Sequence, residues 1–251
     1  MGRNMQYRLD SFLRAQKSYK ANTPIQTYMR EHLLKMLIGM YPNELNFPYI
    51  FEFGCGHCEL TNMIAKHVNY KHYICNDIHK YDNTKLPKYT HRICFDMRDI
   101  IHKPIYHKRF NLIASNACLQ WLPFYETIQN LNHILHKNGI LLIGTFGTDN
   151  YKEIRDITGI GLPYPTSEYI KDSMRLNFDL IAWHEEHIIL NFDNPLEVFR
   201  HIKQSGVNAL QSCYIKKSWL QIYANNYNNA LTYHIVCFLA RKNNAYCIYP
   251  N

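Results

Sequence analysis

A glycine turn between an apolar segment and a helical pattern constrains this chain more than any other feature. Residues 51–60 read Phe-Glu-Phe-Gly-Cys-Gly-His-Cys-Glu-Leu. Gly54 and Gly56 permit a tight turn and a close backbone approach to a ligand, and the helix that follows offers its positive N-terminal end. A third glycine would usually follow, but Cys58 occupies that position, so a turn without a ligand remains an alternative. The segment predicts a nucleotide-binding unit.

Asp77 supports the ligand-binding interpretation of this turn. It ends the next apolar segment, Tyr73 to Asp77, and it follows Gly56 by 21 residues. An acidic side chain at the tip of the second strand can accept hydrogen bonds from both hydroxyls of a ribose. A helix N-cap and a solvated loop carboxylate are the other possible roles. The spacing favours ribose binding.

Short apolar segments alternate with helical patterns, which predicts parallel strands joined by crossover helices. Up to Gly147 we expect strands at 49–53, 73–75, 91–95, 110–115 and 140–146, and helices at 25–40, 60–68 and 127–136, with a further helix around Phe12 and Tyr19. Beyond it we expect helices at 151–157, 167–175, 195–204 and 216–228 and strands at 178–190 and 231–240. The predicted fold is α/β: a Rossmann-like, seven-stranded, mostly parallel sheet with N-terminal helices and a helical lid insertion.

The chain is long enough for this fold as one domain. Its 251 residues, 47% hydrophobic and 19% charged, can bury a large apolar core. We expect a single domain over 1–251, with N-terminal helices at 1–45 and a cofactor-binding core at 46–147. A substrate lid with the sixth strand would occupy 148–230, and the final strand and tail 231–251.

The cysteines and the apolar segments restrict the cellular setting. Eight scattered cysteines do not form the dense framework of a secreted scaffold, and the N-terminal residues lack the apolar segment of a secretory signal. The longest apolar stretch, 140–146, is far shorter than the roughly 20 residues of a membrane helix. We therefore expect a cytoplasmic protein without membrane insertion. Cys55 and Cys58 would need a second ligand pair to form a zinc site, and the spacing provides none, so no metal is expected.

The net charge bears on the partners of the chain. A formal charge of +8 favours acidic partners, because a positive field raises the encounter rate with anions. Lysines and arginines are dispersed without a basic run, which disfavours nucleic acid as the partner. An acidic carrier protein is the other candidate, and we expect a monomer.

Four motifs in order resemble those of the class I S-adenosylmethionine methyltransferases. Glu52 takes the acidic position two residues before the first glycine, and Asp96 with Met97 matches the pair that follows the third strand. Residues 110–116 and 135–143 match the fourth strand and the turn into the fifth. The resemblance implies S-adenosylmethionine as methyl donor and S-adenosylhomocysteine as product, with Asp96 on the adenine amine and Met97 against its ring. The implied cofactor site comprises Glu52, Gly54, Gly56, Asp77, Asp96, Met97 and Asn116.

The flanking segments resemble the malonyl-acyl-carrier-protein O-methyltransferases of biotin synthesis. The match covers most of the chain and rests on 12–19, 115–121, 145–147 and above all 200–209. It implies methylation of the free carboxylate of a malonyl thioester, which masks the charge so that the thioester can prime pimelate synthesis. Cys58 and the divergent segment between Tyr151 and Asp193 depart from the family pattern.

Methylation of a carboxylate needs little from side chains. The carboxylate is already ionised near neutral pH, so no general base is required, and the rate must come from in-line positioning and exclusion of water. Tyr19 and Arg155 are the catalytic candidates, with Arg155 orienting the carboxylate, and Gln120 and Trp121 would line the substrate pocket. Each of these residues has a simpler alternative role: core packing for Tyr19, exposure to solvent for Gln120, capping of the sheet for Trp121 and a solvated surface position for Arg155.

Other functions share these motifs. A methyltransferase of the same fold could act on another small acid or on a quinone precursor. A methyltransferase-fold assembly factor could keep the fold for protein binding, although intact motif residues from Glu52 to Asp96 argue against a decayed site. RNA methylation is supported only by the charge.

Overall fold

The computed structural model describes residues 23–40, 45–81, 85–205 and 215–243, which divide into two compact units. The core unit comprises the described residues of 28–145, 165–185 and 236–243. The small unit comprises those of 23–27, 146–164 and 186–235.

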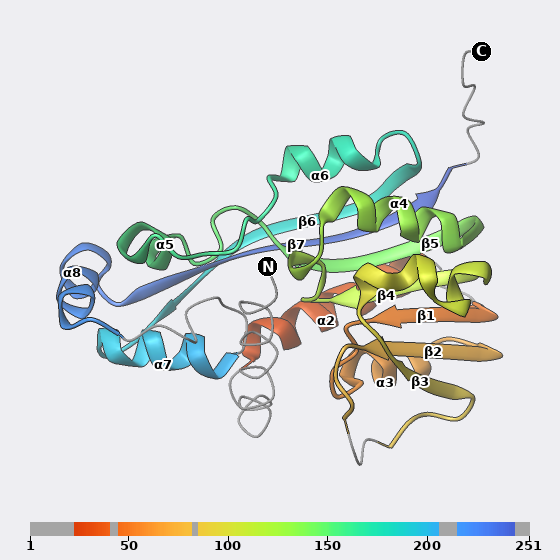
Figure 1. The fold of residues 1–251 in the computed structure, drawn as a ribbon, viewed down its shortest axis with the longest axis horizontal. Coiled ribbons are helices and arrows are strands. Elements are labelled where there is room, and N and C mark those ends of the chain that lie inside the picture. Colours follow the sequence, from red (N-terminus) through yellow and green to blue (C-terminus); the bar gives the residue numbers. More distant parts are fainter. Residues whose placement is uncertain (1–22, 41–44, 82–84, 206–214, 244–251) are drawn as a thin grey trace. The chain divides into compact units, whose positions relative to one another are not determined.

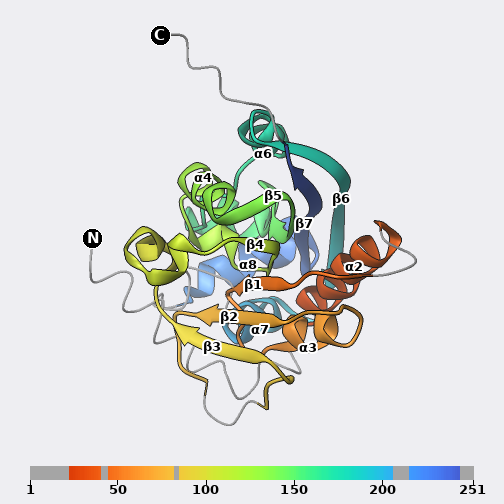
Figure 2. The ribbon, with the colours of Figure 1, turned by 90° about the vertical axis from the view of Figure 1, so that its right-hand side faces the viewer.

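The structure contains a seven-stranded sheet in the order β3-β2-β1-β4-β5-β7-β6, and most of its residues belong to the core unit. Figures 1 and 2 both show β4, β1, β2 and β3 side by side. The sheet is mixed and mostly parallel, which confirms the predicted fold class. The strands are β1 (Tyr49–Phe53), β2 (His72–Asp77), β3 (Thr90–Cys94), β4 (Phe110–Asn116), β5 (Leu135–Phe146), β6 (Phe178–Asn191) and β7 (Ala230–Lys242).

The register of the central strands brings the ends of β1, β2 and β4 to one edge of the sheet. Strand β1 pairs in parallel with both neighbours, so that Ile50 lies opposite Tyr73 and Leu112. Its residues from Ile50 to Phe53 are all buried, as expected for a strand covered on both faces. Ligands of α/β sheets bind at the carboxyl ends of such strands. The glycine turn, Asp77 and Asn116 all lie at this edge.

Helices with one apolar face pack against the sheet. In α2 (Pro24–Met40), the fully buried Met29, Leu33 and Leu37 recur every four residues and form a stripe. In α4 (Phe124–Ile134), Ile128 and Leu131 join the main hydrophobic cluster. The other helical elements of the core unit are α3 (Glu59–Ala65), α6 (Ser167–Met174) and the 3-10 helices η2 (Met97–His102), η3 (Pro104–His107) and η4 (Leu119–Trp121).

The start of β5 differs from the prediction. The helical pattern was expected to continue to His136 and the strand to begin at Ile140, but α4 ends at Ile134 and β5 begins at Leu135. Leu135 is buried and pairs with Phe110, and the register shifts between Phe110 and Leu112 to accommodate the longer strand. Strand pairing and burial therefore override the local helical periodicity.

The small unit contains α5 (Lys152–Thr158), α7 (Pro195–Ser205) and α8 (Lys217–Tyr227), together with parts of β6 and β7. These helices agree with the predicted ranges to within one or two residues. The hydroxyl of Tyr151 donates to that of Tyr233 at 2.8 Å, and Phe199 packs against Tyr223 with ring centroids 5.8 Å apart. The predicted helix around Phe12 lies outside the described residues. Among the helices that are described, none is both long and apolar enough to cross a membrane.

Candidate functional site

The glycine turn has the backbone that its sequence predicts. Gly54, Gly56 and Cys58 all have positive φ, of 67°, 50° and 63°. A Cβ at Gly54 would lie 2.4 Å from Sγ of Cys118, so this position has no space for a side chain. A Cβ at Gly56 would meet no atom of the described residues within 4 Å. The turn is therefore packed on one side and accessible at Gly56, where a ligand can approach the backbone.

Asp77 fixes this turn from the end of β2. Its Oδ2 accepts a hydrogen bond from the backbone N–H of Gly56 at 2.8 Å, and its Oδ1 accepts one from His79 N–H at 3.0 Å. The N–H of Cys55 donates to the carbonyl oxygen of Asn76 at 3.0 Å. Burial raises the pKa of Asp77, against the lowering effect of the two backbone hydrogen bonds. The carboxylate thus stands beside Gly56, as a ribose-binding role requires.

Glu52 lies inside the protein and connects three elements. Its Oε2 accepts hydrogen bonds from Oγ1 of Thr61 on α3 at 2.7 Å and from the hydroxyl of Tyr73 on β2 at 2.5 Å. Burial raises the pKa of Glu52 to about 8, although both hydrogen bonds lower it. Glu52 therefore holds β1, α3 and β2 together beneath the turn, and its predicted contact with the cofactor stays a prediction.

Asp96 and Met97 follow β3 at the start of η2. The side chain of Asp96 accepts hydrogen bonds from the backbone N–H of Arg98 at 3.0 Å and from its Nε at 2.9 Å. The side chain of Arg98 lowers the pKa of Asp96, which keeps this half-buried carboxylate ionised. Met97 is buried and belongs to the main hydrophobic cluster with Ile100 and Ile105.

The residues after β4 form a second close approach of backbone and side chains. Asn116 pairs with Gly144, and a Cβ at Gly144 would lie 2.6 Å from Oδ1 of Asn116. Gln120 is buried rather than exposed, and its Nε2 donates a hydrogen bond to the carbonyl oxygen of Ala117 at 2.8 Å. Trp121 is half-buried at the end of η4. These residues occupy the same sheet edge as the turn, where a substrate pocket was predicted.

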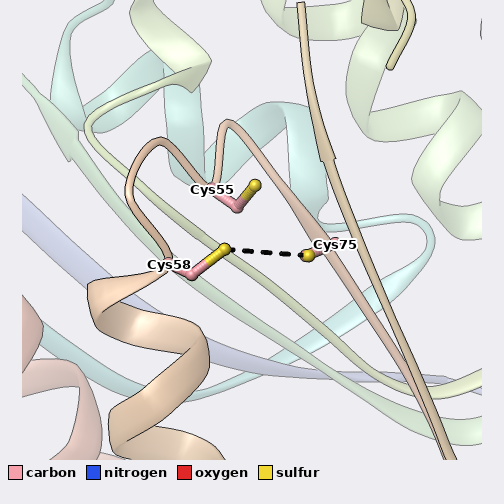
Figure 3. Close-up of side chains that lie close together, drawn as sticks. All are labelled: Cys55, Cys58 and Cys75. Atoms are coloured by element: carbon pink, nitrogen blue, oxygen red, sulfur yellow. Dashed lines mark hydrogen bonds between the residues drawn. The ribbon is translucent and has the colours of Figure 1, made fainter. Parts of the chain in front are cut away.

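The structure reveals a third cysteine beside the turn that sequence reasoning missed. Figure 3 shows Cys55 in the turn, Cys58 at the start of α3 and Cys75 on β2 with their sulfur atoms close together. The three Sγ atoms lie within 4.8 Å of one another. The thiols of Cys55 and Cys75, with the guanidinium of Arg92, lower the pKa of Cys58. Side chains two residues apart share a strand face, so the position of Cys75 two residues before Asp77 was the available signal.

The two catalytic candidates lie elsewhere in the chain. Arg155 is a half-buried residue in the last turn of α5, in the small unit. A Cβ at Gly161 would lie 3.4 Å from Cδ of Arg155, so the stem of the side chain packs against this glycine. The hydroxyl of Tyr164 accepts a hydrogen bond from Nδ2 of Asn150 at 2.9 Å. Tyr19 lies outside the described residues, and the roles of both candidates stay predictions.

A second group of polar side chains lies in the small unit and was not predicted. Nε2 of His187 and Oδ2 of Asp149 are 2.9 Å apart, and the rings of His187 and His234 stack with centroids 4.1 Å apart. The hydrogen bond from His187 lowers the pKa of Asp149. The three residues come from separate segments, so their spacing along the chain gave no indication that they meet.

Comparison with known proteins identifies the family of this chain. Residues 51–143, which contain the turn, Asp77 and Asn116, match the model of a methyltransferase domain family. The chain is 31% identical to the malonyl-[acyl-carrier protein] O-methyltransferase of Haemophilus influenzae, over 92% of each chain. It is 29% identical to the enzyme of that name from Calditerrivibrio nitroreducens, over 95% of this chain and 97% of the relative.

A solved structure supports the fold. The N-methyltransferase NodS from Bradyrhizobium japonicum, in complex with S-adenosylhomocysteine, superposes with a TM-score of 0.51 at 12% identity. The match covers 92% of this chain and 98% of NodS. The fold, the glycine turn with its acidic partners and the similarity over nearly the whole length lead to one conclusion: the chain belongs to the family of malonyl-[acyl-carrier protein] O-methyltransferases.

Proposed function

We propose that this protein transfers the methyl group of S-adenosylmethionine to the free carboxylate of a malonyl thioester carried by acyl carrier protein. The product is the methyl ester that primes the synthesis of pimelate and biotin. The observation that carries the proposal is the 31% identity over 92% of both chains with a relative of that activity.

The turn at the end of β1 supplies the proposed cofactor site. Asp77 stands beside the accessible Gly56 and keeps lone pairs for the ribose hydroxyls. The ionised Asp96 is suited to accept a hydrogen bond from the adenine amine. Gly54 and Gly144 let backbone and side chains approach closely around the turn and Asn116. The protein would therefore bind the cofactor mainly by a preformed backbone shape and two carboxylates.

The reaction itself is a direct displacement. A carboxylate oxygen forms a bond to the methyl carbon while the bond from that carbon to the sulfonium sulfur breaks, and neutral S-adenosylhomocysteine leaves. The carboxylate is ionised at neutral pH, so no proton must be removed. The role of the protein is to align the oxygen with the methyl group and to exclude water. We propose that Gln120 and Trp121 line this pocket.

A cation is needed where the carboxylate enters a partly desolvated pocket, because an unpaired buried charge is costly. We assign this role to Arg155, whose guanidinium can form two parallel hydrogen bonds to a carboxylate. Packing of its stem against Gly161 supports the assignment, since it restricts the rotamers of the side chain. We assign the closing of the pocket to Tyr19.

The carrier is the second part of the proposal. The formal charge of +8 favours an acidic carrier protein over coenzyme A, and the proposal needs neither nucleic acid nor a second subunit. It places the protein in the cytoplasm with its carrier. Surface charges are screened beyond roughly 8 Å at physiological ionic strength, so activity with the carrier should fall as salt rises. Equal, salt-independent rates for malonyl carrier protein and malonyl-coenzyme A would contradict carrier docking.

The test of the reaction uses S-adenosylmethionine with a labelled methyl group. The protein is incubated with malonyl carrier protein, and the carrier is isolated and treated with mild base. We expect label on the carrier that base releases as volatile methanol, as a methyl ester requires. Label that base does not convert to methanol would assign the methyl group to another atom, and the absence of label with intact cofactor binding would reject the proposed substrate.

A further inference from the structure

The three cysteines beside the glycine turn have the geometry of a metal site. The Sγ atoms of Cys58 and Cys75 are 3.8 Å apart, and that of Cys55 lies within 4.8 Å of both. Two thiolates that share a tetrahedral zinc ion, at a Zn–S distance of about 2.3 Å, are themselves about 3.8 Å apart. One pair thus has the required separation, and the distances from Sγ of Cys55 exceed it by at most about 1 Å.

The origin of the three thiols makes the arrangement specific. Cys55 belongs to the turn, Cys58 caps the N-terminus of α3 and Cys75 comes from the neighbouring strand β2 (Figure 3). Their side chains are buried, with exposed fractions of 5% for Cys55 and 0% for the other two. Buried thiols from both ends of the turn and from the neighbouring strand therefore converge on one point, while the adjacent Gly56 leaves the outer side of the turn accessible.

The surroundings balance the charge of a bound ion. Three thiolates and a divalent ion together carry one negative charge. The guanidinium of Arg92 donates to Sγ of Cys58 at 2.6 Å and to the carbonyl oxygen of Gly56 at 3.1 Å. Hydrogen bonds from outside the ligand set orient metal ligands in this way and tune their affinity. The loaded cluster would thus be neutral, as burial requires.

From this geometry we propose that Cys55, Cys58 and Cys75 form a binding site for a thiophilic metal ion of the zinc class. The ion joins the turn, the start of α3 and β2 through bonds to sulfur. It stabilises the backbone conformation that presents Gly56 and Asp77. This site is additional to the methyl-transfer chemistry, which uses none of the three thiols.

Cadmium is a suitable probe because its bonds to thiolates give an ultraviolet charge-transfer band, whereas its bonds to histidine do not. The reduced, metal-free full-length protein is titrated with Cd²⁺. We expect a thiolate band that saturates at one equivalent. The absence of a saturable band would overturn the proposal.

Variants locate the site. Cys75→Ser and Cys55→Ser should each weaken Cd²⁺ binding by more than the roughly tenfold that loss of a hydrogen-bond partner of a metal ligand costs. Cys237→Ser is the matched control, since Cys237 is a buried thiol of β7 outside the cluster. Equal affinity in all three variants would place the ion elsewhere and overturn the proposal.

A measurement on the wild-type protein covers the case in which a variant fails to fold. The protein is treated with an alkylating reagent in partial denaturant, with and without Zn²⁺, and the modified cysteines are mapped by mass spectrometry. We expect Zn²⁺ to protect Cys55, Cys58 and Cys75 together and to leave the exposed Cys94 unaffected. Equal modification of the three thiols in both samples would contradict the site.

Discussion

Glu52 links the buried site to a measurable dependence of stability on pH. Burial raises the pKa of this carboxyl group from 4.5 to about 8, so in the folded protein it is protonated at pH 6. In the unfolded chain the same group is ionised at that pH. Unfolding between these two pKa values therefore releases a proton. Replacement of Glu52 by Gln keeps the shape and the acceptor oxygen for Tyr73 and Thr61 but removes the titration.

The sign and the magnitude follow from the two pKa values. A group whose pKa is raised on folding stabilises the protein fully below its unfolded pKa, and this stabilisation is lost as pH rises through its folded pKa. The free energy of unfolding should therefore fall by up to about 1.4 kcal/mol per pH unit between pH 4.5 and 8. Over the whole window the loss amounts to about 5 kcal/mol, a large fraction of the stability of a typical domain.

Urea unfolding at half-unit steps from pH 5 to 8 measures this effect. A chelator keeps ions out of the neighbouring thiol cluster. Histidines also titrate in this range, so the informative quantity is the free energy of unfolding of the wild type minus that of Glu52→Gln. This difference should decrease steadily as pH rises. Glu31→Gln, at an exposed position of α2, is the control and should follow the wild type. Parallel curves for wild type and Glu52→Gln would show that the carboxyl group is not protonated in the fold.

Substitutions at Gly54, Asp77 and Arg155 test the turn and the substrate cation. Gly54→Ala should lower the free energy of unfolding by about 2 to 4 kcal/mol through strain at positive φ and overlap with Cys118. Gly39→Ala, in open space on α2, is the control in the same urea titration and should raise the free energy of unfolding by roughly 0.5–1 kcal/mol. Asp77→Ala should weaken the binding of S-adenosylmethionine, measured by calorimetry, through the loss of two charge-assisted hydrogen bonds, each on the order of 1.5–3 kcal/mol. Unchanged cofactor affinity would show that Asp77 is not part of the cofactor site. Arg155→Ala should reduce turnover of malonyl thioesters without affecting cofactor affinity, and Arg155→Lys should restore only part of the turnover. Full activity of Arg155→Ala at limiting substrate would assign the role to another cation.

Most elements and the glycine turn at the sheet edge could be predicted because local patterns determine them. Buried parallel strands show as apolar runs, and the turn required Gly54 and Gly56 for its positive φ. The start of β5 could not be predicted, because it depends on pairing of Leu135 with Phe110 across the sheet. Pairing across strands leaves no mark in the spacing of residues along one strand.

Contacts between distant segments limited the prediction of the site in the same way. The approach of Cys75 to the turn depends on the parallel register of β1 and β2, so a search for ligand pairs along the chain did not find it. The bond from Gly56 to Asp77 was not predicted either, although the position of Asp77 was. Sequence spacing could show which residues lie at the sheet edge, but not which of them hold one another in place.

The identity of the methylated product tests the central claim most directly. Malonyl carrier protein and acetyl carrier protein, which lacks the free carboxylate, are each incubated with the protein and S-adenosylmethionine and weighed by intact-protein mass spectrometry. We predict that the malonyl form gains the mass of one CH2 group, the difference between an acid and its methyl ester, that base releases the added carbon as methanol, and that the acetyl form is unchanged. Methylation of both forms, or of neither while the cofactor is bound, would contradict this prediction.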